Sequence, residues 1–259
     1  MDTKSDRPLK KAHLGCGETY LEGYYNVDFP QAEHTIVTIR ADLYTDIRRL
    51  DFEPGTLDEV RAHHFLEHFT RAESLALLLR WRRWLAVGGR LVIETPDAEG
   101  IMRDFLATEK LDDRFALERH LLGSQEAGWA VHYDGWYEEK YRFILGAVGF
   151  EIVRVVPYGT NVSKQLNTGG GVGGLIDALV GFVPKGVRDA AGMNTLPNIL
   201  CVARKTGRAV DEPAAARDIL SRSLVGRERQ NKKILDVWLR EFERARSNVG
   251  EVAPFPSQT

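Results

Sequence analysis

The sequence contains little cysteine and almost no net charge. Its two cysteines, Cys16 and Cys201, fall at the ends of short apolar runs, which favours reduced and buried side chains over a disulfide. The formal net charge of −2 provides no general attraction to nucleic acid or to an anionic membrane surface. We therefore expect no nucleic-acid partner.

Long apolar runs are also absent. None approaches the roughly 18 residues that span a bilayer, and the first residues lack the apolar stretch of a signal peptide. The expectation is a cytoplasmic chain without a transmembrane segment. A hydrophobic content of 43% in 259 residues is ordinary for a globular protein, and the length suits one large domain with an appendage.

Short apolar runs alternate with stretches of helical spacing. The capping-box pair Thr70 and Glu73 starts one helix over 71–87, and a second helix is expected over 137–148. The runs that predict strands lie at 11–16, 23–29, 34–43, 57–66, 89–97, 151–158 and 198–205. This alternation indicates the α/β class, with a largely parallel sheet covered by helices on both faces.

Two insertions and a tail fall outside this alternation. The predicted domain covers 1–208, with long insertions at about 98–136 and 159–196, and such loops are usually functional or mobile. For the glycine-rich stretch 168–187 within the second insertion, a loop with a short core-packed helix is favoured over a lid or a lipid contact. The tail, 209–259, is expected to be helical and to pack on the body or a second copy, and we predict self-association through its apolar stripe.

The motif Gly15-Cys16-Gly17 lacks the third glycine of a dinucleotide site. Tyr20 stands at that position, and a phosphate-cradling loop is missing too, so neither NAD nor ATP is well supported. A ligand without phosphate could use the glycines for close backbone approach, while Asp28 at the end of the next strand holds two ribose hydroxyls. S-adenosylmethionine is such a ligand.

The stretches around this motif resemble class I S-adenosylmethionine-dependent methyltransferases in order and spacing. They are "HLGCGETYLEGYYNVDF", "TDIRRLDFEPGTLDEVRAHHFLEHF", "LRWRRWLAVGGRLVIETPD" and "YRFILGAVGFEIVRV". The likeness is closest to a subgroup with LGCG…NVD and LEH motifs, similar to sugar and natural-product methyltransferases. It implies a Rossmann-like, seven-stranded sheet with a reversed last strand, and the cofactor over the carboxyl ends of the first strands.

The resemblance also implies which residues bind S-adenosylmethionine. Gly15 to Gly17 would line its methionine end, Asp28 would accept the ribose hydroxyls, and Asp46 would contact the adenine, with Asp42 as a competitor. The full set of implied cofactor-binding residues is Leu14, Gly15, Cys16, Gly17, Asp28, Phe29, Asp46, Ile47, His63 and His64. The segment between Gly17 and Asp28 is shorter than the family's first helix, as in the subgroup where a loop replaces that helix. In the plainer alternative, Asp28 and Asp46 only cap turns.

Methyl transfer to a hydroxyl requires an aligned nucleophile and removal of a proton. His68 and His132 are the candidate catalytic residues. In small-RNA 3′-terminal ribose methyltransferases and some quinone O-methyltransferases, a Glu-His pair at the position of Glu67 and His68 binds a divalent metal, in the RNA enzymes with a later histidine. The same LEH motif is frequent in methyltransferases without metal, so the sequence leaves a divalent metal open.

The expected function is S-adenosylmethionine-dependent O-methylation of a sugar or glycan hydroxyl or a related small molecule. N-methylation of an amino sugar is one alternative. A non-catalytic S-adenosylmethionine-binding scaffold that recruits a partner through its C-terminal helix is another. The aromatic residues of the first insertion either form a wall for a sugar or planar ring or pack the insertion onto the sheet, and they are Trp129, Tyr133, Trp136 and Tyr137.

Overall fold

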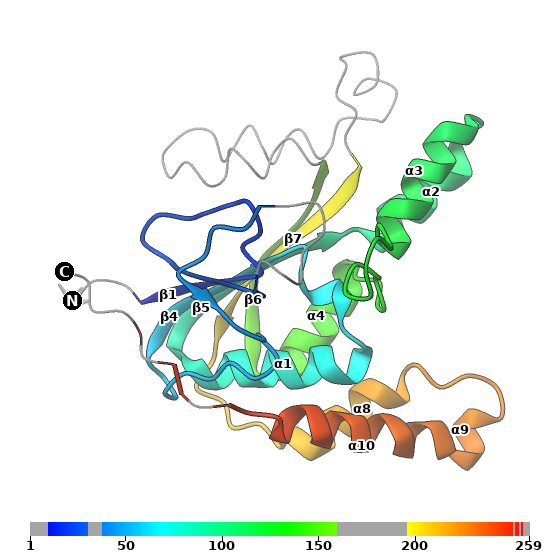
Figure 1. Ribbon diagram of the computed structural model, residues 1–259. Helices are drawn as coiled ribbons and strands as arrows, with labels where there is room; N and C mark the ends of the chain where they lie inside the picture. Colours follow the sequence, from blue (N-terminus) through cyan, green and yellow to red (C-terminus); the bar gives the residue numbers. More distant parts are fainter. Residues whose placement is uncertain (1–9, 31–37, 160–195, 251, 254, 256–259) are drawn as a thin grey trace.

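The fold is a seven-stranded sheet of order β3-β2-β1-β4-β5-β7-β6 (Figure 1). The computed structural model describes residues 10–30, 38–159, 196–250, 252, 253 and 255. The strands are β1 (Lys11–Leu14), β2 (Tyr25–Asp28), β3 (Leu43–Tyr44), β4 (Leu57–His63), β5 (Leu85–Pro96), β6 (Phe150–Gly159) and β7 (Pro197–Lys205). Within the described residues, β7 runs antiparallel to both of its neighbours, β5 and β6, and the other strand pairs are parallel. The predicted seven-stranded, mostly parallel sheet with a reversed last strand is therefore confirmed.

The helices α1 (Arg71–Trp84) and α4 (Glu138–Ala147) share one hydrophobic core against the sheet (Figure 1). The capping box of α1 is present: the Thr70 hydroxyl accepts from the Glu73 amide at 3.3 Å, and the Thr70 amide donates to the Glu73 carboxylate at 3.1 Å. Helices on the opposite face stay a prediction. None of the helices among the described residues is long and apolar enough to cross a membrane.

The third predicted strand is much shorter than expected. Of the predicted range 34–43, residues 34–37 lie outside the described residues, and β3 begins only at Leu43. The backbone before Asp42 bonds to the glycine turn instead of β2. The Arg40 amide donates to the Gly17 carbonyl at 3.4 Å, and the Arg40 carbonyl accepts the Cys16 thiol at 3.4 Å. The first backbone bond to β2 comes from the Asp42 amide, which donates to the Asn26 carbonyl at 2.8 Å.

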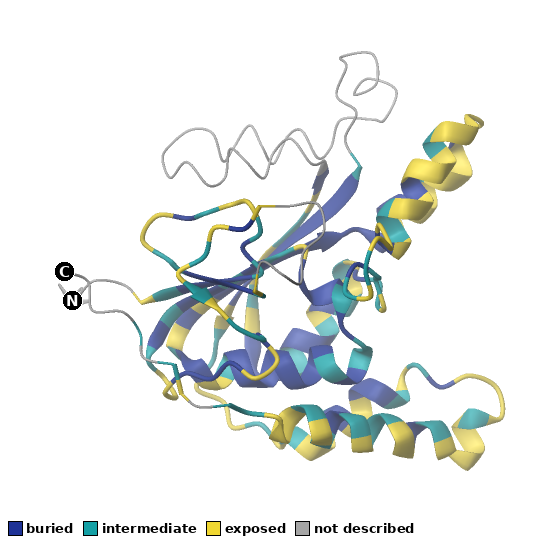
Figure 2. Cartoon of the chain, in the orientation of Figure 1, coloured by how far each residue is buried: buried dark blue, intermediate teal, exposed yellow. Residues whose placement is uncertain are grey.

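The first insertion contains two helices, α2 (Ala98–Ala107) and α3 (Leu111–Leu122), which pack against each other and project from the sheet (Figure 2). The sequence analysis did not assign them because their apolar residues do not mark a core-facing side: α3 buries only Leu117, while Leu111, Phe115 and Leu122 are exposed. The glycine-rich stretch 168–187 lies outside the described residues.

The tail forms α8 (Glu212–Ser221), the short α9 (Glu228–Asn231) and α10 (Lys233–Ser247). The α10 helix lies along α1 and buries Leu235 and Phe242 in the main core (Figure 1). The apolar stripe of the tail therefore packs on the body of the same chain. Self-association through it, and the division into 1–208 and 209–259, stay predictions.

A buried arginine fastens the end of α10 to α1. The Arg80 side chain is 5% exposed, and its guanidinium donates to the carbonyls of Ala245 at 2.9 Å and Asn248 at 3.1 Å. The last carbonyls of a helix have no partner within the helix, and a cation near them also interacts favourably with the helix dipole. Arg80 therefore satisfies acceptors that would otherwise be unpaired at this interface.

We predict that Arg80→Met lowers the free energy of unfolding by about 2–3 kcal/mol, because buried carbonyls lose a charged donor while the aliphatic stem is kept. Urea denaturation followed by circular dichroism measures this difference. The matched control is Arg240→Met on the exposed side of α10, which should change stability by less than about 0.5 kcal/mol. Equal effects of the two substitutions would contradict the role of Arg80.

Candidate functional site

The turn after β1 depends on two glycines with left-handed backbone angles. Gly15 has φ +65° and Gly17 has φ +53°, a region that L side chains rarely adopt. A Cβ on Gly15 would lie 2.5 Å from Cδ2 of Phe65, whereas a Cβ on Gly17 would meet nothing within 4 Å. Gly15 is therefore required by packing, and Gly17 leaves an open space beside the backbone.

Asp28, at the end of β2, points into this turn. Its carboxylate is buried and accepts the Gly17 amide at 2.6 Å and the Phe29 amide at 2.7 Å. Cys16 lies between the glycines, where burial raises the pKa of its thiol to about 12, so the thiol stays protonated. Its Sγ donates to the Arg40 carbonyl at 3.4 Å, and only its backbone faces the turn as a candidate ligand group. The structure thus brings Gly15, Gly17 and Asp28 together.

The predicted adenine residues have other partners. The Asp46 carboxylate accepts both the Arg48 amide at 2.9 Å and the Arg48 Nε at 3.0 Å, as in the capped-turn alternative. Ile47 and Leu14 are fully buried in the core. The competing Asp42 accepts the Tyr20 hydroxyl at 2.8 Å in addition to the Asn26 amide. The adenine role of either aspartate stays a prediction.

The two histidines that end β4 have different surroundings. His63 is neutral near pH 7, because burial lowers its pKa to about 4, and its ring packs edge-on against His13 at 5.7 Å. His64 has φ +47°, and its ring lies between Glu67, at 3.4 Å from Nδ1, and Glu94, at 3.1 Å from Nε2. Burial lowers the pKa of His64, but the two carboxylates raise it more, to about 10. His64 therefore carries positive charge and joins two carboxylates.

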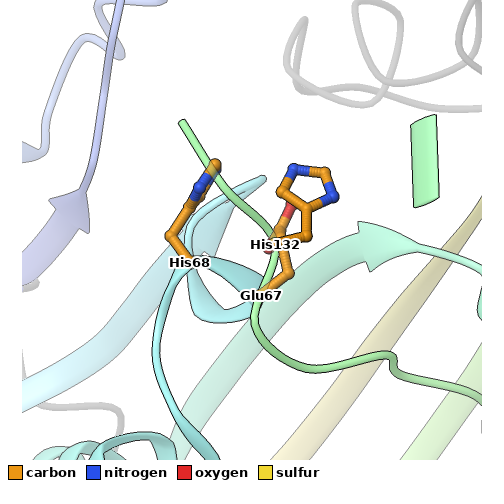
Figure 3. Close-up of side chains that lie close together, drawn as sticks. All are labelled: Glu67, His68 and His132. Carbon is orange, nitrogen blue, oxygen red and sulfur yellow. The ribbon is translucent and has the colours of Figure 1, made fainter. Parts of the chain in front are cut away.

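Glu67 also belongs to a cluster with His68 and His132 (Figure 3). Glu67 and His68 belong to the 3₁₀ turn η2 (Leu66–His68), and the backbone amide of Tyr133 donates to the Glu67 carbonyl at 2.8 Å. This bond brings the end of the first insertion onto η2. The His68 and His132 rings lie edge-on with centroids 4.7 Å apart. The two predicted catalytic histidines are therefore neighbours.

Glu94 is a site residue that the sequence analysis missed. It lies in β5, is 2% exposed, and pairs with His64. The available signal was an acidic residue inside the predicted strand 89–97, since a charged side chain is rarely buried without a partner. His120 also escaped attention; its Nε2 lies 3.0 Å from the carbonyls of Pro197 and the Asn198 side chain, so it fastens α3 to β7.

The aromatic residues of the first insertion divide between two roles. Trp136 is 1% exposed and packs on Tyr141 with ring centroids 4.8 Å apart. Tyr133 and Tyr137 are exposed. Trp136 thus belongs to the core, and an aromatic wall built from the exposed tyrosines stays a prediction.

A scan against protein-family models gives no match, and neither does a search of curated protein sequences. Among solved structures, a S-adenosylmethionine-dependent methyltransferase from Methanosarcina mazei shares 13% identity over 77% of this chain and 94% of that one, with a TM-score of 0.45. One from Mesorhizobium loti shares 15% identity over 76% of this chain and 91% of that one, also with a TM-score of 0.45. A phosphoethanolamine N-methyltransferase from Haemonchus contortus was solved with S-adenosylhomocysteine. It shares 12% identity over 79% of this chain and 51% of that one, with a TM-score of 0.41.

We predict that Gly15→Ala and Gly17→Ala destabilise the fold by different amounts. Both place a Cβ on a left-handed residue, which costs about 1–2 kcal/mol. Only Gly15→Ala also forces its Cβ against Phe65, which adds about 1–3 kcal/mol of overpacking. Chemical denaturation of the two variants measures the difference, and equal losses would show that the contact with Phe65 relaxes freely.

Proposed function

We propose that the chain is a S-adenosylmethionine-dependent methyltransferase that acts on a hydroxyl of a sugar, a glycan or a related small molecule. The observation that carries the proposal is the turn at Gly17, which is open on one side and is faced by the Asp28 carboxylate. The turn and the carboxylate stand at the carboxyl ends of the neighbouring parallel strands β1 and β2. Open α/β sheets bind their ligands at this edge.

The backbone after the turn favours a ligand without phosphate. Dinucleotide and nucleotide sites place phosphates at the N-terminus of a helix that follows the glycine-rich turn. Here residues 15–24, all described, form turns and extended backbone rather than a helix. The charged side chains at the turn are also acidic, Glu18 and Asp28, which suits a positively charged sulfonium better than a pyrophosphate.

The residues at this edge of the sheet fit S-adenosylmethionine, and each would have a separate role in binding or transfer. When bound, S-adenosylmethionine supplies a methyl carbon that the acceptor oxygen attacks; the carbon–oxygen bond forms, the carbon–sulfur electron pair stays on sulfur, and a proton leaves the oxygen. The Asp28 carboxylate would accept the ribose hydroxyls, and the bare backbone of Gly17 would let the ligand approach closely. His132 can accept the proton, because burial lowers its pKa and keeps the ring neutral near pH 7.

We predict that Asp28→Asn weakens S-adenosylmethionine binding roughly 10- to 150-fold, because hydrogen bonds to a charged acceptor are worth about 1.5–3 kcal/mol. Isothermal titration calorimetry measures the change, with circular dichroism to confirm the fold. Asp112→Asn on the exposed face of α3 is the matched control. If wild-type protein does not bind the ligand, the proposed function is wrong.

A second prediction concerns turnover. With a methyl-labelled donor and a panel of sugar nucleotides and glycans, His132→Gln and His68→Gln should each lower kcat about 10²- to 10⁴-fold on a hydroxyl acceptor, since a proton must be removed. The matched control, Glu118→Gln on the exposed face of α3, should retain turnover. Unchanged kcat in both site variants would favour an amine acceptor, which needs no strong base. Ligand binding without transfer to any acceptor would instead favour a non-catalytic scaffold.

A further inference from the structure

The Glu67 carboxylate is buried without a hydrogen-bond donor among the described residues, and the charged His64 ring is the positive group paired with it. The side chain is 2% exposed, and within the described part of the chain neither carboxylate oxygen has a hydrogen-bond partner. One oxygen, Oε1, forms an ion pair with His64 Nδ1 at 3.4 Å, which is long for a hydrogen bond. A buried carboxylate is costly unless charge and hydrogen bonds compensate it. Both oxygens therefore keep unused capacity to bind a further positive group.

The two histidines beside Glu67 present lone pairs. His68 Nδ1 lies 3.3 Å from the carbonyl oxygen of Val131, and His132 Nδ1 lies 3.3 Å from that of Leu121. A carbonyl can only accept, so each Nδ1 carries the hydrogen and each Nε2 keeps its lone pair. Metal-binding histidines adopt this arrangement, in which one nitrogen donates to a carbonyl and the other binds the ion.

We propose that Glu67, His68 and His132 together bind one divalent transition-metal ion. A ligand atom from each of the three residues lies within 4.8 Å of the other two. Figure 3 shows the three side chains gathered where η2 meets the segment that carries His132. Ligands about 2.0–2.2 Å from a common ion lie roughly 3–4 Å apart, so small side-chain rotations close the site.

The donor set determines which metals fit. Two imidazole nitrogens and one carboxylate suit Zn²⁺, Co²⁺ or another first-row transition metal, whereas Mg²⁺ and Ca²⁺ prefer all-oxygen sites. Three protein ligands also leave a coordination position open, as in catalytic zinc sites. The catalytic use of the ion rests on the proposed methyl transfer: a cation at the open position lowers the pKa of an acceptor hydroxyl that it contacts. Ion binding itself does not rest on that proposal.

The test begins with full-length protein stripped by a chelator and titrated with ZnCl₂, CoCl₂ and MgCl₂. We expect one Zn²⁺ or Co²⁺ per chain, visible absorption of the Co²⁺ form typical of a nitrogen- and oxygen-ligated site, and at least about 100-fold weaker Mg²⁺ binding. Glu67→Gln and His132→Gln should each weaken Zn²⁺ binding at least about 100-fold, since even indirect partners of a metal ligand contribute 10- to 100-fold. Glu118→Gln, on the exposed face of α3 and outside the cluster, should leave binding unchanged.

Several outcomes overturn the metal site. These are no Zn²⁺ binding by wild-type protein, or binding that Glu67→Gln and His132→Gln leave unchanged. His68→Ala, at a partly exposed ring, provides the same test if the Glu67 variant does not fold. Failure of the metal site and of the proposed function are distinguishable: methyl transfer that survives full chelation refutes only the metal, and Zn²⁺ binding without S-adenosylmethionine binding refutes only the methyltransferase.

Discussion

The hydrogen bond from the Gly17 amide to the Asp28 carboxylate, 2.6 Å long, is the interaction on which the candidate cofactor site depends. It joins the end of β2 to the turn after β1 and holds a buried charge at the edge of the sheet. The turn can donate this bond because Gly15 and Gly17 have left-handed backbone angles, and Phe65 leaves no room for a Cβ on Gly15. Backbone conformation, packing and charge therefore agree at this one position.

The second half of the site depends on a long-range backbone contact. The Tyr133 amide donates to the Glu67 carbonyl, so the insertion between β5 and α4 closes over η2 and brings His132 beside His68. On the other side of η2, His64 holds Glu67 and Glu94 with one charged ring. The site thus contains residues from four neighbouring strands, β1, β2, β4 and β5. Their carboxyl ends lie at one edge of the sheet because these strands are parallel.

Local signals made much of the fold predictable. The Thr70–Glu73 capping box, the glycine turn and the short apolar strands depend on neighbouring residues, and the structure contains them. The insertion helices α2 and α3 were not predicted in this way, because most apolar residues of α3 are exposed and only Leu117 is buried. The proximity of His68 and His132 was suggested only by resemblance, since no spacing rule relates residues joined through a long insertion. The adenine role of Asp46 rests on the resemblance alone and stays a prediction, since the structure shows its carboxylate paired with Arg48.

The buried carboxylate of Glu67 distinguishes two uses of the neighbouring histidines. Two imidazole rings that only remove a proton or orient a substrate do not need a buried carboxylate beside them. The Glu67 carboxylate, which has no hydrogen-bond donor in the described part of the chain, is not explained by such a role. Burial raises the pKa of the Glu67 carboxyl, but His64 and the two neighbouring histidines lower it more, so Glu67 stays charged. The Val131 and Leu121 carbonyls each lie beside an Nδ1, which leaves both Nε2 atoms for a metal ion. This geometry supports the proposed metal site, and a bound ion would occupy the Nε2 that accepts the proton when no metal is present.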